Sequence, residues 1–99
     1  MQTTETCDAQ RATPETIRRD WDRAGFTCEL WIDPPQHVEE LEHDVDARIY
    51  LSEGSCLIEF DSHSVRLEAG SQMAIPAGVR HTVRNCGTGR AHWLHGFPA

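Results

Sequence analysis

From residue 26 onward, the hydrophobic residues of this chain recur at every second position, in short runs separated by Gly, Pro, Ser and Asp. A period of two is typical of β-strands that bury one face. The pattern predicts strands within residues 26–32, 41–51, 56–60, 65–67, 73–76, 79–85 and 91–97. Roughly eight short strands with such turns are typical of an antiparallel sandwich or barrel. Its expected interior includes Ile58, Val65, Leu67, Ile75 and Val83.

The segment before the strands has the start and end residues typical of one short helix. Thr13 suits the N-cap, Pro14 the first helical position and Gly25 the end of the helix. One face carries Ile17, Trp21 and Ala24. We therefore expect a helix over residues 13–25, packed outside a β-barrel over residues 26–99, and a flexible polar arm over residues 1–12.

Three of the six histidines fall on the apolar face of a predicted strand, namely His43, His81 and His95. Neutral imidazole is the commonest metal ligand, and a barrel interior brings distant strands together. The pattern predicts that the three converge, close enough for one ion to bind all of them at about 2.0–2.2 Å. Three unrelated core histidines are the alternative. We interpret His37, His63 and His92 as surface residues without a role.

Composition narrows the classes of function. The net charge is −7, and residues 1–49 carry twelve acids against five arginines, so no basic surface for nucleic acid is expected. The chain has no lysine, which excludes Schiff-base chemistry through a lysine. No apolar run is long enough to span a membrane or to form a signal peptide, which favours a cytoplasmic protein. Without a CxxC pair, the four cysteines are expected to be free thiols.

Gly70, Pro76, Gly78, His81 and Asn85 form a motif of fixed spacing, G-x5-P-x-G-x2-H-x3-N. This motif resembles the second signature motif of the cupin superfamily at every defined position. When the first cupin motif is anchored on Gly54, its two histidine positions fall on Leu41 and His43, and its glutamate position falls on Ala47. The resemblance covers about residues 27–98.

The resemblance implies an all-β fold, the double-stranded β-helix or jelly-roll barrel of cupins, in agreement with the strand pattern. Metal-binding cupins hold their ion with three histidines and a glutamate. Here His43 and His81 match ligand positions, whereas Leu41 and Ala47 do not coordinate metals. His95, on the inward face of the last strand, is the candidate for a third nitrogen. Three nitrogens with open positions suit zinc, copper, nickel or iron(II), and not magnesium or calcium.

Two functions follow from the resemblance. The first is a barrel that binds a small organic molecule, with or without a metal, in a pocket lined by Cys28, Leu41, Trp93 and Phe97. The alternative is a metal-dependent enzyme of the dioxygenase, isomerase or decarboxylase type. Ala47 at the glutamate position removes the obvious carboxylate for acid–base chemistry, which favours binding. Exposed sheet edges favour a homodimer.

Overall fold

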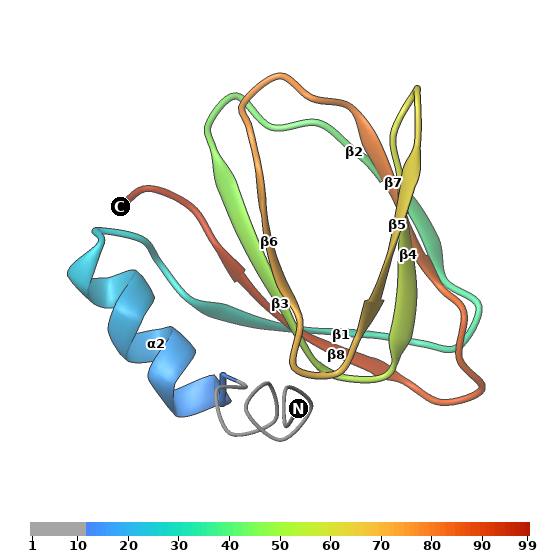
Figure 1. Cartoon of the computed structure of the whole chain (residues 1–99), viewed down its shortest axis with the longest axis horizontal. Coiled ribbons are helices and arrows are strands. Elements are labelled where there is room, and N and C mark those ends of the chain that lie inside the picture. The colour runs from blue at the N-terminus through green and yellow to red at the C-terminus, as the bar shows by residue number, and fades with distance from the viewer. Residues whose placement is uncertain (1–11) are drawn as a thin grey trace, which may run out of the picture.

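The structure, a computed structural model, describes residues 12–99, which form one helix and two four-stranded antiparallel sheets (Figure 1). The first sheet has the strand order β1-β8-β3-β6, and the second has the order β2-β7-β4-β5. The elements are α2 (Pro14–Arg23), β1 (Glu29–Asp33), β2 (Val38–Leu41), β3 (Ala47–Glu53), β4 (Ser55–Glu59), β5 (Ser64–Glu68), β6 (Gln72–Ile75), β7 (His81–Asn85) and β8 (Ala91–Gly96). The predicted all-β barrel with an N-terminal helix is confirmed.

The main core lies between the two sheets and is built from alternate residues of their strands. It comprises Ala47, Ile49, Leu51, Cys56, Ile58, Leu67, Ile75, Val83, Ala91 and Trp93. Val65 is partly buried and packs against this cluster. The interior residues predicted from the period of two are therefore confirmed. Burial of each large side chain contributes about 1.5–3 kcal/mol.

A second, smaller cluster holds α2 against the outer face of the first sheet (Figure 1). Ile17 and Trp21 of the helix pack on Tyr50 of β3 and Leu94 of β8. The side chain of Thr13 accepts a hydrogen bond from the backbone of Thr16, so the predicted N-cap is confirmed. The predicted arm, residues 1–12, lies outside the described residues except for Ala12, whose carbonyl accepts a hydrogen bond from the Tyr50 hydroxyl.

The face assignment of the first strand was wrong. Cys28 was expected to line the interior pocket, and Leu30 and Ile32 share its face by alternation, but Leu30 and Ile32 are 55% and 47% exposed, and Cys28 packs against the cluster under α2. The register of β1 on β8 places Trp31 opposite Trp93, so Trp31 faces the interior. Because β1 is apolar on both faces, the period of two cannot decide which face is buried.

The single strand expected over residues 41–51 is divided in two. β2 ends at Leu41 in one sheet and β3 begins at Ala47 in the other, so the connection must cross between the sheets. The carbonyl of His43 accepts a hydrogen bond of 2.8 Å from the backbone of Gly78, which binds this connection to the turn before β7. Gly78 has φ +78°, as expected for the tight turn after Pro76.

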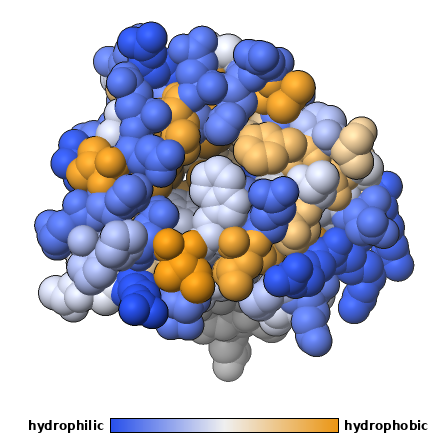
Figure 2. Space-filling view, turned by 180° about the vertical axis from the view of Figure 1, so that it is seen from behind, coloured by the Kyte–Doolittle hydropathy of each residue, from blue (hydrophilic) through white to orange (hydrophobic). Residues whose placement is uncertain are grey.

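The surface carries few large hydrophobic residues. Among the described residues the exposed ones are Leu30, Ile32, Val38 and Val45. Figure 2 shows hydrophobic side chains on one face, in small groups separated by hydrophilic ones. Within residues 12–99, no helix has the length and apolar character needed to cross a membrane.

Gly96 provides a test of how closely α2 approaches the barrel. A Cβ atom at this position would lie 2.6 Å from Cε3 of Trp21 and would also meet the carbonyl oxygen of Thr27. We expect Gly96→Ala to lower the free energy of unfolding by about 1–3 kcal/mol in urea denaturation, because the helix must shift outward. Gly89→Ala is the matched control, since nothing lies within 4 Å of its added Cβ. Equal denaturation midpoints for the two variants would contradict this packing.

Candidate functional site

One end of the barrel interior collects imidazole rings from different elements. β7 supplies His81, β8 supplies His95, and the β2–β3 connection supplies His43. The rings of His43 and His81 lie 5.9 Å apart between centroids, and both imidazoles contribute to the shifted pKa of His95. His81 and His95 are only 3% and 5% exposed, whereas His43 is partly exposed. The three predicted residues therefore share one region of the interior, which we call the imidazole end.

Aromatic rings surround these imidazoles. Trp31 stacks on His95 with a centroid distance of 3.7 Å and an interplanar angle of 13°. The edge of Phe97 meets His43 at 4.9 Å, and Phe60 lies 6.2 Å from His81. Because Trp31, Phe60 and Phe97 are partly exposed, flat apolar surfaces reach from solvent to the buried imidazoles. Such a mixture of apolar walls and a few polar atoms is typical of small-molecule sites.

The hydrogen bonds and burial of His81 and His95 determine how their ring nitrogens can bind a ligand. Nδ1 of His81 lies 2.9 Å from the carbonyl oxygen of Val79. Since a carbonyl only accepts, Nδ1 of His81 carries a proton, and Nε2 is the nitrogen left for a ligand. Burial, together with the neighbouring His43 and His81, lowers the pKa of His95 to about 4. His95 is therefore neutral at pH 7.

The donor set at the imidazole end fits a metal ion only in part. Two of the four cupin ligand positions carry histidine, and His95 adds a third imidazole. Within residues 12–99, however, one group of three potential ligands has all its ligand atoms within 4.8 Å of one another, and that group does not include these histidines. A single ion shared by His43, His81 and His95 stays a prediction.

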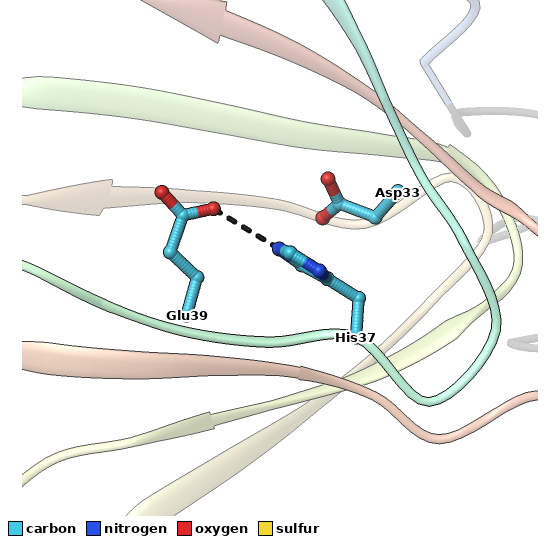
Figure 3. A group of neighbouring side chains, drawn as sticks. All are labelled: Asp33, His37 and Glu39. Carbon is cyan, nitrogen blue, oxygen red and sulfur yellow. Dashed lines mark hydrogen bonds and ion pairs between the residues drawn. The ribbon is translucent and has the colours of Figure 1, made fainter.

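The compact group of potential ligands consists of Asp33, His37 and Glu39 (Figure 3). Asp33 ends β1, His37 lies in the β1–β2 connection, and Glu39 belongs to β2. Nε2 of His37 lies 3.2 Å from a carboxylate oxygen of Glu39. Asp33 and His37 are partly buried and Glu39 is exposed. We call this group the seam cluster, because it lies where the edge strands of the two sheets meet.

The turn that carries the seam cluster is held by Asn85, the last residue of the Gly70–Asn85 motif. Nδ2 of Asn85 donates to the carbonyl of Pro34 at 2.9 Å, and its backbone nitrogen donates to the carbonyl of His37 at 2.9 Å. The backbone nitrogen of His37 also donates to Pro34. These bonds fix the backbone of the β1–β2 connection between two members of the cluster.

The structure places three of the four predicted pocket residues in the interior. Leu41 lies opposite His81 in the register of β2 and β7, Trp93 is fully buried, and Phe97 contacts His43. Cys28 is the exception and lies under α2. Sequence reasoning missed Trp31, Asp33, His37 and Glu39. The sequence did contain an indication for two of them. Residues 37 and 39 precede Leu41 at a spacing of two, and alternate residues of a strand point to the same face, which here is the inward face of β2.

The described cysteines, Cys28, Cys56 and Cys86, are free, in agreement with the expectation for them; Cys7 lies outside the described residues. Burial raises the pKa of Cys56 to about 12, with smaller contributions from Cys86, Asp33 and Glu68. A thiol with such a pKa stays protonated at pH 7 and is a poor nucleophile or metal ligand. Cys56 therefore acts as a core residue.

A separate hollow of about 190 Å³ is lined by Phe26, Asp46, Ala47, Arg48, Ala74, Ile75 and Pro76. The guanidinium of Arg48 lies 4.0 Å from the centre of the Phe26 ring, which is a cation–π contact. None of the predicted ligand or metal residues lines this hollow, so it does not belong to the imidazole end.

The burial of His95 predicts a loss of stability in mild acid. The unfolded chain takes up this proton near pH 6.5 and the folded protein only near pH 4, so the free energy of unfolding falls between these values. Urea denaturation of EDTA-treated protein should show a loss of roughly 2–4 kcal/mol from this group over that range. A His95→Gln variant should lose less, whereas His63→Ala, at an exposed position, should behave as the unchanged protein. Parallel pH profiles for His95→Gln and the unchanged protein would contradict the lowered pKa.

Comparison with known proteins agrees with this architecture. Residues 29–97 match the cupin domain family. A cupin superfamily protein from Desulfitobacterium hafniense aligns with a TM-score of 0.65 and 22% identity, over 74% of this chain and 66% of that one.

A cupin-2 domain containing protein from Shewanella frigidimarina aligns with a TM-score of 0.63 and 24% identity, over 76% and 72% of the two chains. The EutQ protein of Clostridium difficile aligns with a TM-score of 0.63 and 16% identity, over 74% and 56%. No curated protein matched the sequence. The two-sheet barrel, the Gly70–Asn85 motif and the match over residues 29–97 show that this chain belongs to the cupin family.

Proposed function

We propose that this cupin binds a small organic molecule at the imidazole end of its barrel. The observation that carries the proposal is the convergence of His43, His81 and His95 beneath partly exposed aromatic rings. Buried imidazoles without fixed charge, next to flat apolar surfaces, are the elements from which specific small-molecule sites are made.

The chemistry of the imidazole end favours an uncharged, planar ligand with hydrogen-bonding groups. His95 is neutral at pH 7, so it offers no charge to an anion, and the net charge of −7 also repels anions. The stacking of Trp31 on His95 shows that this end accommodates one planar ring against another. Phe97 provides a further aromatic edge.

Binding is favoured over acid–base catalysis at this end. Ala47 occupies the position at which the cupin motif has a glutamate, and its buried methyl group cannot transfer a proton. His81, whose Nδ1–H is donated to the carbonyl of Val79, can orient a ligand through Nε2. The metal-dependent enzyme stays the alternative.

We further propose that imidazole nitrogens bind a first-row transition-metal ion at this end. The fixed tautomer of His81 supports it, because a carbonyl that accepts from the second ring nitrogen is the usual arrangement around a ligating histidine. When bound, zinc, copper, nickel or iron would supply a Lewis acid at this end. The residues that would hold it are His43, His81 and His95.

Ligand binding can be tested with phenol and benzamide as probes, followed by ¹H–¹⁵N NMR of the whole chain. We expect their strongest shifts at the Trp31 indole and the His95 ring, because these groups stack at the proposed site. His95→Gln should weaken binding about fivefold or more, because it removes the imidazole ring that stacks with Trp31. His92→Gln is the matched control, because His92 lies on the same strand but on its outward alternation. Shifts that are unchanged in His95→Gln would contradict binding at this end.

The metal part of the proposal is tested by nickel uptake in protein purified without a histidine tag. His81→Ala should abolish uptake at the imidazole end and His95→Ala should weaken it strongly, whereas His63→Ala should have no effect. Full occupancy of that site in His95→Ala would contradict the three-histidine arrangement and leave ligand binding as a separate question.

A further inference from the structure

The two sheets of the barrel do not pair with each other between β1 and β2. β1 is the edge strand of the first sheet and β2 is the edge strand of the second. The short connection from Asp33 to Val38 joins these two edges, and the seam cluster lies along it (Figure 3). Ligand atoms from two edge strands and their connection therefore gather at one point that solvent can reach.

The donor atoms of the seam cluster have the chemistry of a metal site. They are one imidazole nitrogen from His37 and carboxylate oxygens from Asp33 and Glu39, all within 4.8 Å of one another. We propose that Asp33, His37 and Glu39 bind a divalent transition-metal ion at the connection between β1 and β2. Three protein ligands leave the remaining coordination positions to water or to a further ligand.

A second observation points to a charged group at this place. The indole nitrogen of Trp93 is buried and has no hydrogen-bond partner among the described residues. Trp93 itself is fully buried, and its N–H lies on the side of Asp33: burial raises the pKa of that carboxyl group, and the nearby indole N–H opposes the effect in part. A buried donor behind a carboxylate is the arrangement that orients a metal-ligating oxygen.

The backbone of the seam cluster is fixed before any ion binds. Pro34 and Pro35 restrict the connection, and the side chain and backbone of Asn85 bind it at Pro34 and at His37. Asn85 is itself 2% exposed and donates a further hydrogen bond to Gly89. An ion would therefore reorient mainly the His37 and Glu39 side chains, which now bind each other.

The ligand set selects a class of ion. Imidazole nitrogen suits zinc, iron and nickel, and carboxylate oxygen suits manganese as well, whereas a site without thiolate disfavours copper(I). Magnesium and calcium prefer sites made only of oxygen. We therefore expect a divalent ion such as zinc or manganese. The two carboxylates balance the charge of that ion.

The seam cluster is distinct from the imidazole end. Glu39 and Leu41 are successive inward positions on β2, and Leu41 lies opposite His81. The potential ligand atoms that lie within 4.8 Å of one another come from Asp33, His37 and Glu39, and this group includes none of the three histidines of the imidazole end. The inference therefore does not rest on the proposed function.

Zinc titration of EDTA-treated protein, measured by calorimetry, tests the site. The measurement is made in the His81→Ala background, so that the imidazole end does not contribute. We expect one zinc ion per chain and a loss of affinity of at least about tenfold in Glu39→Gln, which removes the charge of one ligand while nearly keeping its shape. Glu40→Gln is the matched control, because Glu40 is on the same strand and exposed but outside the seam cluster.

A paramagnetic ion locates the site independently of affinity. Cobalt(II) added to the same protein should broaden the NMR signals of His37 and of the Trp93 indole before those of His95 and Phe60. His37→Ala should abolish this selective broadening, and circular dichroism should show that the variant keeps its fold. The proposal is overturned if zinc binds His37→Ala and Glu39→Gln with unchanged affinity, or if cobalt broadens no signals near His37.

Discussion

The hydrogen bonds of one buried amide hold the two sheets together at the seam end of the barrel. Asn85 donates from Nδ2 to Pro34 and Gly89, accepts from the backbone of Gly87 at Oδ1, and donates its backbone N–H to His37. These partners lie in the β1–β2 and β7–β8 connections. Because the strands of both connections belong to different sheets, a single side chain fixes the separation of the sheets there. Loss of either connection would leave a buried amide unsatisfied, which is costly.

The opposite end depends on backbone contacts. Gly78 donates to the carbonyl of His43, and the backbone of Ala77 donates to the Asp46 carboxylate. The β2–β3 connection is therefore bound to the turn that begins β7, and this places His43 near His81 although their strands are not paired through these residues. The motif from Gly70 to Asn85 thus holds both ends: its glycine turn binds the connection that carries His43, and its asparagine binds the connection that carries His37.

The sequence was sufficient for the inward faces of β7 and β8, because Val83 on β7 and Trp93 on β8 mark them, and the outward positions on β7 are Thr82 and Arg84. It failed for β1, where Leu30 and Trp31 are both apolar and only the register on β8 decides which one is buried. It also failed at the β2–β3 connection, since alternation continues through residues 42–46 while the chain crosses between sheets.

The candidate sites were predictable to different extents. The alternation of inward and outward positions predicted that His43, His81 and His95 lie in one region. The distances between their rings depend on side-chain orientation, which a periodic pattern does not contain. The seam cluster needed the tertiary structure, because Asp33 and Glu39 belong to different sheets and approach only through the turn at Pro34. His37 was interpreted as a surface residue for the same reason.

The packing of α2 on β8 has a consequence for the interior. Leu94 faces the helix and His95 faces the imidazoles, so adjacent residues of one strand belong to opposite sides of the sheet. The peptide between them is planar and rigid, and the β8 backbone is paired on both sides with β1 and β3. A displacement of the helix that moves the backbone at Leu94 therefore also moves the backbone that carries His95, on whose ring Trp31 stacks. The outer helix and the imidazole end are mechanically coupled through a single residue step.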